Sequence, residues 1–350
     1  MRLDSANRSF AILVGSSLLL GMYLMCGAVG GVLVPLIVSR ASHAGLSGVV
    51  SGSHNLVPAV IFVSLVTVGV VLGARSLWRQ IGASHALAIR VSSLAMPLPA
   101  ALAQAADHAS LQGRVILVDA PEWFSFAYGA LTPRVAISHG LFEGVSEDEL
   151  TAILEHESYH VRNLDPLKVL LVRALPATFL FLPALSALRT RYVAGRELAA
   201  DRRAVKECGR TPLAAALLKV VRGPAWSELE VAAAIGGPEL LDIRVAQLES
   251  GSEPPLAGMS PAGIGLSLLV VLMFAGAFVA SIVSAGGTAA VSHATGTAID
   301  FTEVLSGAAC IVPFAIGGLA AYWLIARRAR EPLSDATEHG TRIVSEQTFR

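Results

Sequence analysis

The chain has 350 residues, of which 54% are hydrophobic and 15% are charged, and its formal net charge is zero. An ordinary soluble domain has roughly 25% charged residues, so this composition favours a membrane protein. A zero net charge gives no electrostatic reason to expect direct nucleic-acid binding. The three cysteines lie far apart without a CxxC pair, which indicates neither a disulfide framework nor a thiolate zinc site.

Four apolar stretches are long enough to cross a hydrocarbon core of about 30 Å, which takes roughly 20 helical residues. We expect transmembrane helices at residues 10–38, 56–74, 264–283 and 304–325. The first stretch follows Arg2 and Arg8, as a secretory signal would. It is longer than the 7–15 apolar residues of a signal peptide, so we interpret it as a retained span.

The distribution of lysine and arginine predicts the orientation of these spans. Residues 284–303 hold no basic side chain and residues 40–55 hold only Arg40, whereas residues 189–244 hold ten. Basic loops stay on the cytoplasmic side of a membrane. We therefore expect a protein of a bacterial-type cell membrane, surrounded by the lipid bilayer, with both termini and the region 75–260 in the cytoplasm.

A fifth apolar run covers residues 167–188. A single crossing here would place the ten basic residues outside, against the charge rule. Pro176 and Pro183 also interrupt its helical hydrogen bonds. A re-entrant or interfacial hairpin that returns to the same side fits better than a complete crossing.

The cytoplasmic region begins with two short β-branched stretches, "GRVILVDAP" and "PRVAIS", which predict strands. We expect "FSFAYGALTPRVAIS" to supply a strand at the edge of a sheet. An extended peptide could add to such an edge by main-chain pairing at Phe126, Ala127, Tyr128 and Gly129. Alternatively, the aromatic side chains of this segment belong to the core or to the membrane interface.

A helix is predicted from about residue 147 to residue 163. Ser146 and Glu149 have the spacing of a capping box, and the helix should stop before Pro166. The stretch "HESYH" places His156 and His160 on one helical face, where both imidazoles can reach a zinc ion at about 2.0–2.1 Å. Glu157 lies about 100° around the helix, so we predict that it accepts the proton of a zinc-activated water.

Downstream, "RELAADRRAV" places Glu197 and Asp201 one helical turn apart. Glu197 can complete a His₂Glu zinc site, and Asp201 can accept the second ring N–H of a ligating histidine. The alternative is a basic surface helix that happens to carry two acids. A zinc site requires Glu197 to lie beside His160, so residues 161–196 must turn back toward the histidines. This agrees with the predicted hairpin.

These motifs resemble the BlaR/MecR-type antirepressor peptidases, which are membrane metallopeptidases of the gluzincin type. The resemblance covers about residues 115–250 and rests on "HESYHVRNLDP", "ELAADRRAV" and the "FSFAYGALTPRVAIS" segment. HtpX-type membrane proteases share HExxH and ExxxD and are the alternative. The resemblance implies one Zn²⁺ held by His156, His160 and Glu197, Glu157 as catalytic base, and Asp201 as the supporting acid.

The chain departs from the sensor members of that group. It contains no Ser-x-x-Lys motif and no penicillin-binding sensor domain, so we expect no covalent β-lactam binding. The resemblance implies a protein or peptide substrate, such as a transcriptional repressor of the kind cut by family members. Arg196, Arg202 and Arg203 were considered for stabilising the oxyanion, but solvated or lipid-facing arginines are the commoner outcome, so we select none.

The predicted fold is a mainly α integral membrane protein with a small α+β gluzincin-like domain. We expect two spans in residues 1–75, the zinc endopeptidase domain in 76–260, two spans in 261–326, and a disordered cytoplasmic tail in 327–350. An HtpX-like quality-control protease and a metal-free signalling scaffold are the alternatives. A transporter is disfavoured because the four spans carry no clear internal charge.

Overall fold

The computed structural model describes residues 5–28, 56–179, 182–224, 238–256, 258–273 and 275–276. The predicted span at 304–325 and the predicted tail lie outside these residues. The chain forms two compact units, one of Met1–Ser17 with Ile61–Val270 and one of Leu18–Val60 with Val271–Arg350. All residues of the candidate site belong to the first unit, and the arrangement described below is confined to it.

A four-stranded sheet lies within the first unit. Its strands are β1 (Ala95–Met96), β2 (Val115–Val118), β3 (Ser125–Tyr128) and β4 (Arg134–Ser138), in the order β1-β2-β4-β3. β2 and β4 are parallel, whereas β1 pairs with β2 and β3 pairs with β4 in antiparallel fashion. The two predicted strands are confirmed as β2 and β4, and the aromatic segment supplies the predicted edge strand as β3.

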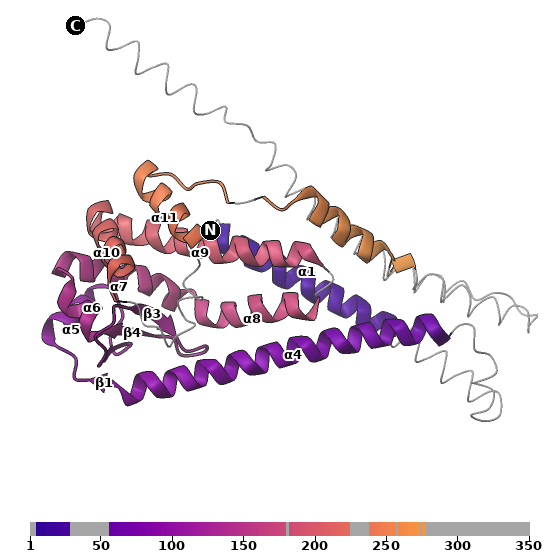
Figure 1. Cartoon of the computed structure of the whole chain (residues 1–350), viewed down its shortest axis with the longest axis horizontal. Helices are drawn as coiled ribbons and strands as arrows, with labels where there is room; N and C mark the ends of the chain where they lie inside the picture. The colour runs from indigo at the N-terminus through magenta and orange to yellow at the C-terminus, as the bar shows by residue number, and fades with distance from the viewer. Residues whose placement is uncertain are drawn as a thin grey trace, which may run out of the picture. The chain divides into compact units, whose positions relative to one another are not determined.

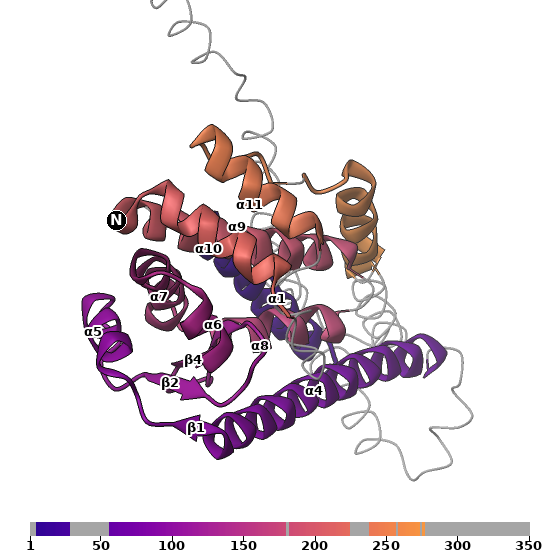
Figure 2. The same cartoon turned by 60° about the vertical axis from the view of Figure 1, so that its left-hand side comes forward.

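The two faces of the sheet pack against different helices. Phe126 and Tyr128 are buried with Val91 near the end of α4 (Leu56–Ser93). The opposite face buries Leu117 and Ile137 against helices on the other side. These helices are α5 (Ala100–His108) and α7 (Glu147–Arg162), which lie across the sheet from α4 (Figure 2). Because side chains alternate along a strand, β3 carries aromatics on one face and small residues on the other.

Helix α7 follows the short helix α6 (His139–Gly144) and begins as predicted. Glu149 Oε2 accepts a hydrogen bond from the Ser146 amide at 2.8 Å, and Ser146 Oγ accepts one from the Glu149 amide at 3.3 Å. This reciprocal pair is a capping box and satisfies two amides at the start of the helix. The helix ends at Arg162, and Leu164 adopts a left-handed conformation with φ 54° before the next helix begins.

The apolar run 167–188 forms a helical hairpin. Its arms are α8 (Asp165–Thr178) and α9 (Pro183–Cys208), which lie side by side (Figure 1). Pro183 lies at the first turn of α9, where its missing N–H costs nothing. Helix α9 also packs against α7. The hairpin therefore brings the chain back to the helix that carries His156 and His160, as the zinc hypothesis requires. The depth of the hairpin in a membrane stays a prediction.

Other helices hold this hairpin in place. Gly69 and Gly73 of α4 face Thr178 at its tip so closely that a Cβ at either position would collide with it. On α1 (Ser5–Ala28), the ring of Phe10 lies 5.6 Å from that of Tyr192 on α9. The domain is completed by α10 (Arg210–Arg222) and by α11 (Pro238–Ser250).

Only part of the predicted membrane topology is visible. Within the described ranges, Ser5–Leu24 is the one helical segment long and apolar enough to cross a bilayer, and a shorter apolar helix covers Pro261–Met273. A single segment of this kind near an N-terminus is weak support for a span. The fold is therefore mainly helical with a small sheet, and the four-span topology stays a prediction.

Candidate active site

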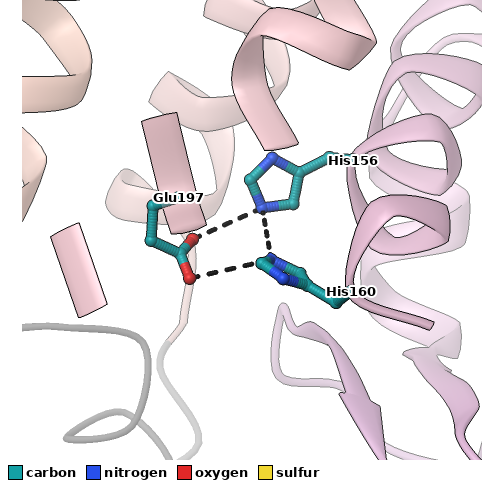
Figure 3. Close-up of side chains that lie close together, drawn as sticks. All are labelled: His156, His160 and Glu197. Carbon is teal, nitrogen blue, oxygen red and sulfur yellow. Dashed lines mark hydrogen bonds and ion pairs between the residues drawn. The ribbon is translucent and has the colours of Figure 1, made fainter. Parts of the chain in front are cut away.

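The three predicted metal ligands meet in the structure (Figure 3). His156 Nε2 lies 3.3 Å from His160 Nε2 and 3.4 Å from Glu197 Oε2, and His160 Nε2 lies 3.6 Å from Glu197 Oε1. All three side chains are buried. Two ligands at 2.0–2.1 Å from a tetrahedral zinc ion lie about 3.3 Å apart. The three ligand atoms therefore have the mutual spacing of a tetrahedral zinc site.

Each histidine is oriented by a carboxylate at its other ring nitrogen. His156 Nδ1 lies 2.8 Å from Asp201 Oδ1, as predicted. His160 Nδ1 lies 2.7 Å from Asp165 Oδ2. A carboxylate that accepts the Nδ1 hydrogen leaves the Nε2 lone pair available for a metal. Both imidazoles are therefore oriented to bind a cation between them and Glu197.

Asp165 is itself held in place. The hydroxyl of Tyr192 donates a hydrogen bond to Asp165 Oδ1 at 3.0 Å, and Tyr192 is completely buried. Burial and then the nearby charge of Asp165 raise the pKa of Tyr192 above its usual value. The phenol therefore stays protonated and acts as a hydrogen-bond donor.

Two guanidinium groups lie beside Glu197. Arg196 Nε lies 3.0 Å from Glu197 Oε1, and Arg244 Nη1 lies 3.7 Å from Glu197 Oε2. Burial opposes ionisation of Glu197, but the charges of His160 and Arg196 outweigh it and hold the pKa of that carboxyl well below its usual range. Glu197 is therefore an ionised, acceptor-only ligand at neutral pH.

The carboxylates around His156 favour the charged form of its ring. Burial lowers its pKa, but hydrogen bonding to Asp201 and Glu197 outweighs burial and raises the pKa to about 9. A metal ligand must be neutral, so a cation binding at His156 would compete with a proton.

The charge of the site also fits a divalent cation. Four buried carboxylates, Glu157, Asp165, Glu197 and Asp201, lie around the two histidines. Arg196 and Arg244 are the two guanidinium groups that balance them within this part of the described chain. With both imidazoles neutral, two negative charges remain. Buried charge needs compensation, which one divalent cation would supply.

A cavity of about 220 Å³ opens beside the ligand cluster. Glu157 lines it together with His156, His160 and Glu197, and so reaches the space where a substrate carbonyl would lie. One wall is apolar and comes from α10; its members are Leu213, Ala216, Leu217 and Val220. The cavity therefore combines a cluster of potential metal ligands and a potential base with an apolar surface.

Strand β3 forms another part of the cavity wall. Of the residues predicted to bind substrate, Phe126 and Ala127 line the cavity, as does the neighbouring Ser125. Tyr128 and Gly129, the other two residues of the predicted peptide-binding stretch, are not among the residues that line the cavity. Tyr128 is buried in the cluster against α4, and Gly129 lies in the turn after β3 with φ 88°. Phe126 and Tyr128 share the face toward α4, whereas Ser125 and Ala127 lie on the opposite face of the strand.

On its outer edge, β3 pairs with no other strand among the residues that the structure describes. The Ser138 amide donates to the Phe124 carbonyl at 3.1 Å, which makes these residues a hydrogen-bonded pair of the β3–β4 ladder. Such pairs alternate along antiparallel strands. Phe126 and Tyr128 therefore bond toward β4, and the amide groups of Ser125 and Ala127 point away from it. An extended peptide could pair with these groups.

The three arginines considered for the oxyanion have different positions. Arg196 lines the cavity. Arg202 pairs with Glu253 at 2.6 Å, and Arg203 pairs with Glu155 at 3.1 Å on another side of α7. Of these three arginines, Arg196 is thus the one that lies beside the cavity.

Comparison with known proteins identifies the family. Residues 49–248 match the sequence model of the family described as BlaR1 peptidase M56. The chain belongs to this family. Membership confirms the resemblance inferred from the motifs, and the matched region contains every residue of the candidate site.

This M56-family chain is also similar to proteins named Protease HtpX. It is 35% identical to the one from Shewanella halifaxensis (strain HAW-EB4) over 86 residues, which are 24% of this chain and 30% of that protein. It is 38% identical to the one from Shewanella sp. (strain W3-18-1) over 72 residues, 20% of this chain and 25% of that protein. The chain thus matches less than a third of the length of these relatives. The matches agree with HtpX as the alternative resemblance.

Sequence analysis of this M56 peptidase domain missed three residues of the site: Asp165, Tyr192 and Arg244. Asp165 carries a signal, because it follows His160 by five residues and opens the next helix. Tyr192 and Arg244 carried no local signal. Their contacts depend on how α8, α9 and α11 pack together.

Proposed function

We propose that this M56-family chain is a membrane-embedded, zinc-dependent endopeptidase that cleaves peptide bonds at the cytoplasmic face of the membrane. The observation that carries the proposal is the 3.3–3.6 Å spacing of the nitrogen and oxygen atoms of His156, His160 and Glu197. Three such ligands around one open position are the arrangement of catalytic zinc. The family and the similarity to HtpX proteases support the same activity.

In this proposal His156, His160 and Glu197 hold the zinc ion. When bound, zinc lowers the pKa of a water molecule and polarises the substrate carbonyl. Glu157 lines the same cavity without lying in the ligand cluster. It accepts the proton of the attacking water at its carboxylate and passes that proton to the leaving amine. Asp201 and Asp165 keep both imidazoles oriented throughout.

The substrate is a protein or peptide that binds in extended form. Its main chain pairs with the open edge of β3 at Ser125 and Ala127, which sets the scissile bond beside the ligand cluster. The apolar wall from α10 then receives an apolar substrate side chain. Main-chain pairing orients the peptide, and the wall gives side-chain preference.

The proposed setting is a bacterial-type cell membrane. The peptidase region 76–260 lies in the cytoplasm between pairs of spans in 1–75 and 261–326, and both termini are cytoplasmic. The substrate is a repressor-like protein, as the resemblance to the BlaR/MecR-type antirepressor peptidases implies. A quality-control protease is the second candidate, favoured by the matches to HtpX.

The test uses the full chain in membranes and the variant Glu157→Gln. We expect this variant to keep one zinc ion per chain, because Glu157 is not a ligand, and to lose about 10²–10⁴-fold in cleavage rate, the usual contribution of a general base. Zinc is measured by elemental analysis and cleavage by comparing peptide fragments from cells. Fragments from one regulator favour the repressor hypothesis, whereas many membrane-protein fragments favour quality control.

The matched control is Glu147→Gln, the same substitution at an exposed position on the same helix. It should leave both zinc content and fragments unchanged. A Glu157→Gln variant whose fragment pattern equals that of the parent chain would refute the peptidase proposal. If neither the parent chain nor the Glu157→Gln variant contained zinc, and the variant kept its function, the metal-free scaffold would be favoured.

A further inference from the structure

Helix α11 docks on α9 through a face that is largely polar. Its buried positions are Leu240, Arg244 and Gln247, whose spacing places them on one helical stripe. Gln247 Nε2 donates to the Leu198 carbonyl at 2.9 Å, and Arg244 reaches Asp201. A face selected only for core packing would be apolar, because buried polar groups stabilise only when they are paired. Both polar side chains instead reach the stretch of α9 that carries the metal site.

Arg244 makes two parallel hydrogen bonds to one carboxylate. Its Nε lies 2.8 Å from Asp201 Oδ2 and its Nη2 lies 2.7 Å from Asp201 Oδ1. A two-point contact of this kind fixes the plane of the carboxylate as well as its distance. Asp201 Oδ1 lies in turn 2.8 Å from His156 Nδ1. The orientation of the His156 ring is therefore linked, through Asp201, to α11.

The third nitrogen of the same guanidinium lies beside another ligand. Arg244 Nη1 is 3.7 Å from Glu197 Oε2, and Arg244 itself is buried. One side chain thus contacts the acid that orients a histidine and approaches the carboxylate that completes the ligand set. Arg244 also lines the cavity. Within the described chain, it joins α11 to two of the three metal-binding side chains.

We propose that Arg244 is a positioning residue of the metal site, which fixes Asp201 and the His156 ring and keeps Glu197 in place. This inference rests on the proposed function, because it takes His156 and Glu197 as metal ligands. It gives α11 a part in assembling the site.

Two effects of Arg244 on metal binding oppose each other. Its positive charge repels a cation, but both oxygens of Asp201 face it at hydrogen-bonding distance, so the pair presents little net charge to the metal. Its orienting effect has no such compensation. Removing a group that orients a ligating histidine usually lowers metal affinity by about 10–100-fold. Loss of orientation should therefore outweigh relief of repulsion.

The experiment measures zinc affinity in the full chain, purified in detergent with the Glu157→Gln substitution so that proteolysis does not enter the result. Arg244→Met and Arg244→Lys are compared by competition for zinc with a chromophoric chelator. We expect Arg244→Met to bind zinc about 10–100-fold more weakly. Arg244→Lys should show a smaller loss, because an ammonium keeps the charge but cannot form the two parallel bonds.

A spectroscopic measurement separates positioning from general destabilisation. With Co²⁺ in place of zinc, the visible absorption of the Arg244→Lys protein should shift, because the ligand geometry changes. The control Gln247→Met removes the other polar contact between α11 and α9. It should lower the free energy of unfolding but leave zinc affinity and the Co²⁺ spectrum unchanged. If Arg244→Met does not fold, Arg244→Lys with its spectrum decides the question.

Three outcomes would overturn the inference: zinc binding by both Arg244 variants as tight as in the parent, tighter binding by Arg244→Met, or an equal loss of affinity in Gln247→Met. Failure of the proposed function would look different. In that case the Glu157→Gln parent, with Arg244 intact, would already bind no zinc.

Discussion

Helix α7 buries a glutamate on each of two sides, and one of these glutamates lines the cavity. Glu155 and Glu157 are separated by one residue and are buried to similar extents, with 3% and 6% exposed. Arg203 Nη2 lies 3.1 Å from Glu155 Oε2, and Ser158 Oγ lies 3.3 Å from the same oxygen. Glu157 instead lines the cavity beside the ligand cluster. We call these the Glu155 side and the Glu157 side.

The comparison shows that burial and charge do not by themselves mark a functional carboxylate. On the Glu155 side, the negative charge is neutralised by a partner from α9, which leaves nothing for a ligand to satisfy. On the Glu157 side, four carboxylates face two guanidinium groups, and the excess negative charge faces a cavity. Uncompensated buried charge at a cavity points to a bound cation.

The largest effect should follow from removing a ligand on the Glu157 side. Glu197→Gln keeps the size of the side chain but removes its charge, so we expect zinc affinity to fall by more than about 100-fold, beyond the usual effect of an outer partner. Chelator competition measures it. Glu207→Gln, an exposed position on the same helix, is the control and should bind zinc normally. Equal zinc affinity in both variants would contradict the ligand assignment.

A smaller and different effect is expected on the Glu155 side. Glu155→Gln leaves Arg203 without its charged partner, and the free energy of unfolding should fall by about 1–3 kcal/mol. Because Arg203 is 27% exposed, water can replace part of the lost contact. Denaturant unfolding of the purified protein measures this change. Zinc affinity should not change; a loss of zinc would mean that the two sides are not independent.

The smallest effect concerns the hairpin that brings Glu197 to α7. Gly73→Ala places a methyl group against Thr178 at the hairpin tip. We expect it to lower the free energy of unfolding by about 1 kcal/mol, the low end for overpacking. Gly82→Ala on the same helix meets nothing within 4 Å and should stabilise by about 0.5–1 kcal/mol. Thermal unfolding in detergent compares them, and equal shifts of the same sign would refute close packing at Gly73.

Features that depend on neighbours in the sequence were predictable. The capping box of Ser146 and Glu149 and the strands β2 and β4 appear where the sequence placed them. The shared face of His156 and His160 follows from helical periodicity alone. The approach of Glu197 was also predictable, because one metal ion imposes a distance between two motifs.

Side-chain direction within a strand depends on what packs against each face. The edge position of β3 is confirmed, and peptide binding at Phe126, Ala127, Tyr128 and Gly129 stays a prediction. Tyr128 belongs to the α4 side of the sheet, and Ser125 belongs to the cavity. Without the packing of α4, the sequence could not tell which alternate residues face the site.

The sequence by itself determined that His156 and His160 share one helical face with Glu157 about 100° away, and that Glu197 and Asp201 share a face of a second helix, because helical periodicity sets the spacing within each motif. The tertiary structure alone decided that Asp165 orients His160, that Tyr192 holds Asp165, and that Arg244 holds Asp201. These contacts join separate helices. Their geometry comes from packing between elements, which local sequence patterns do not encode.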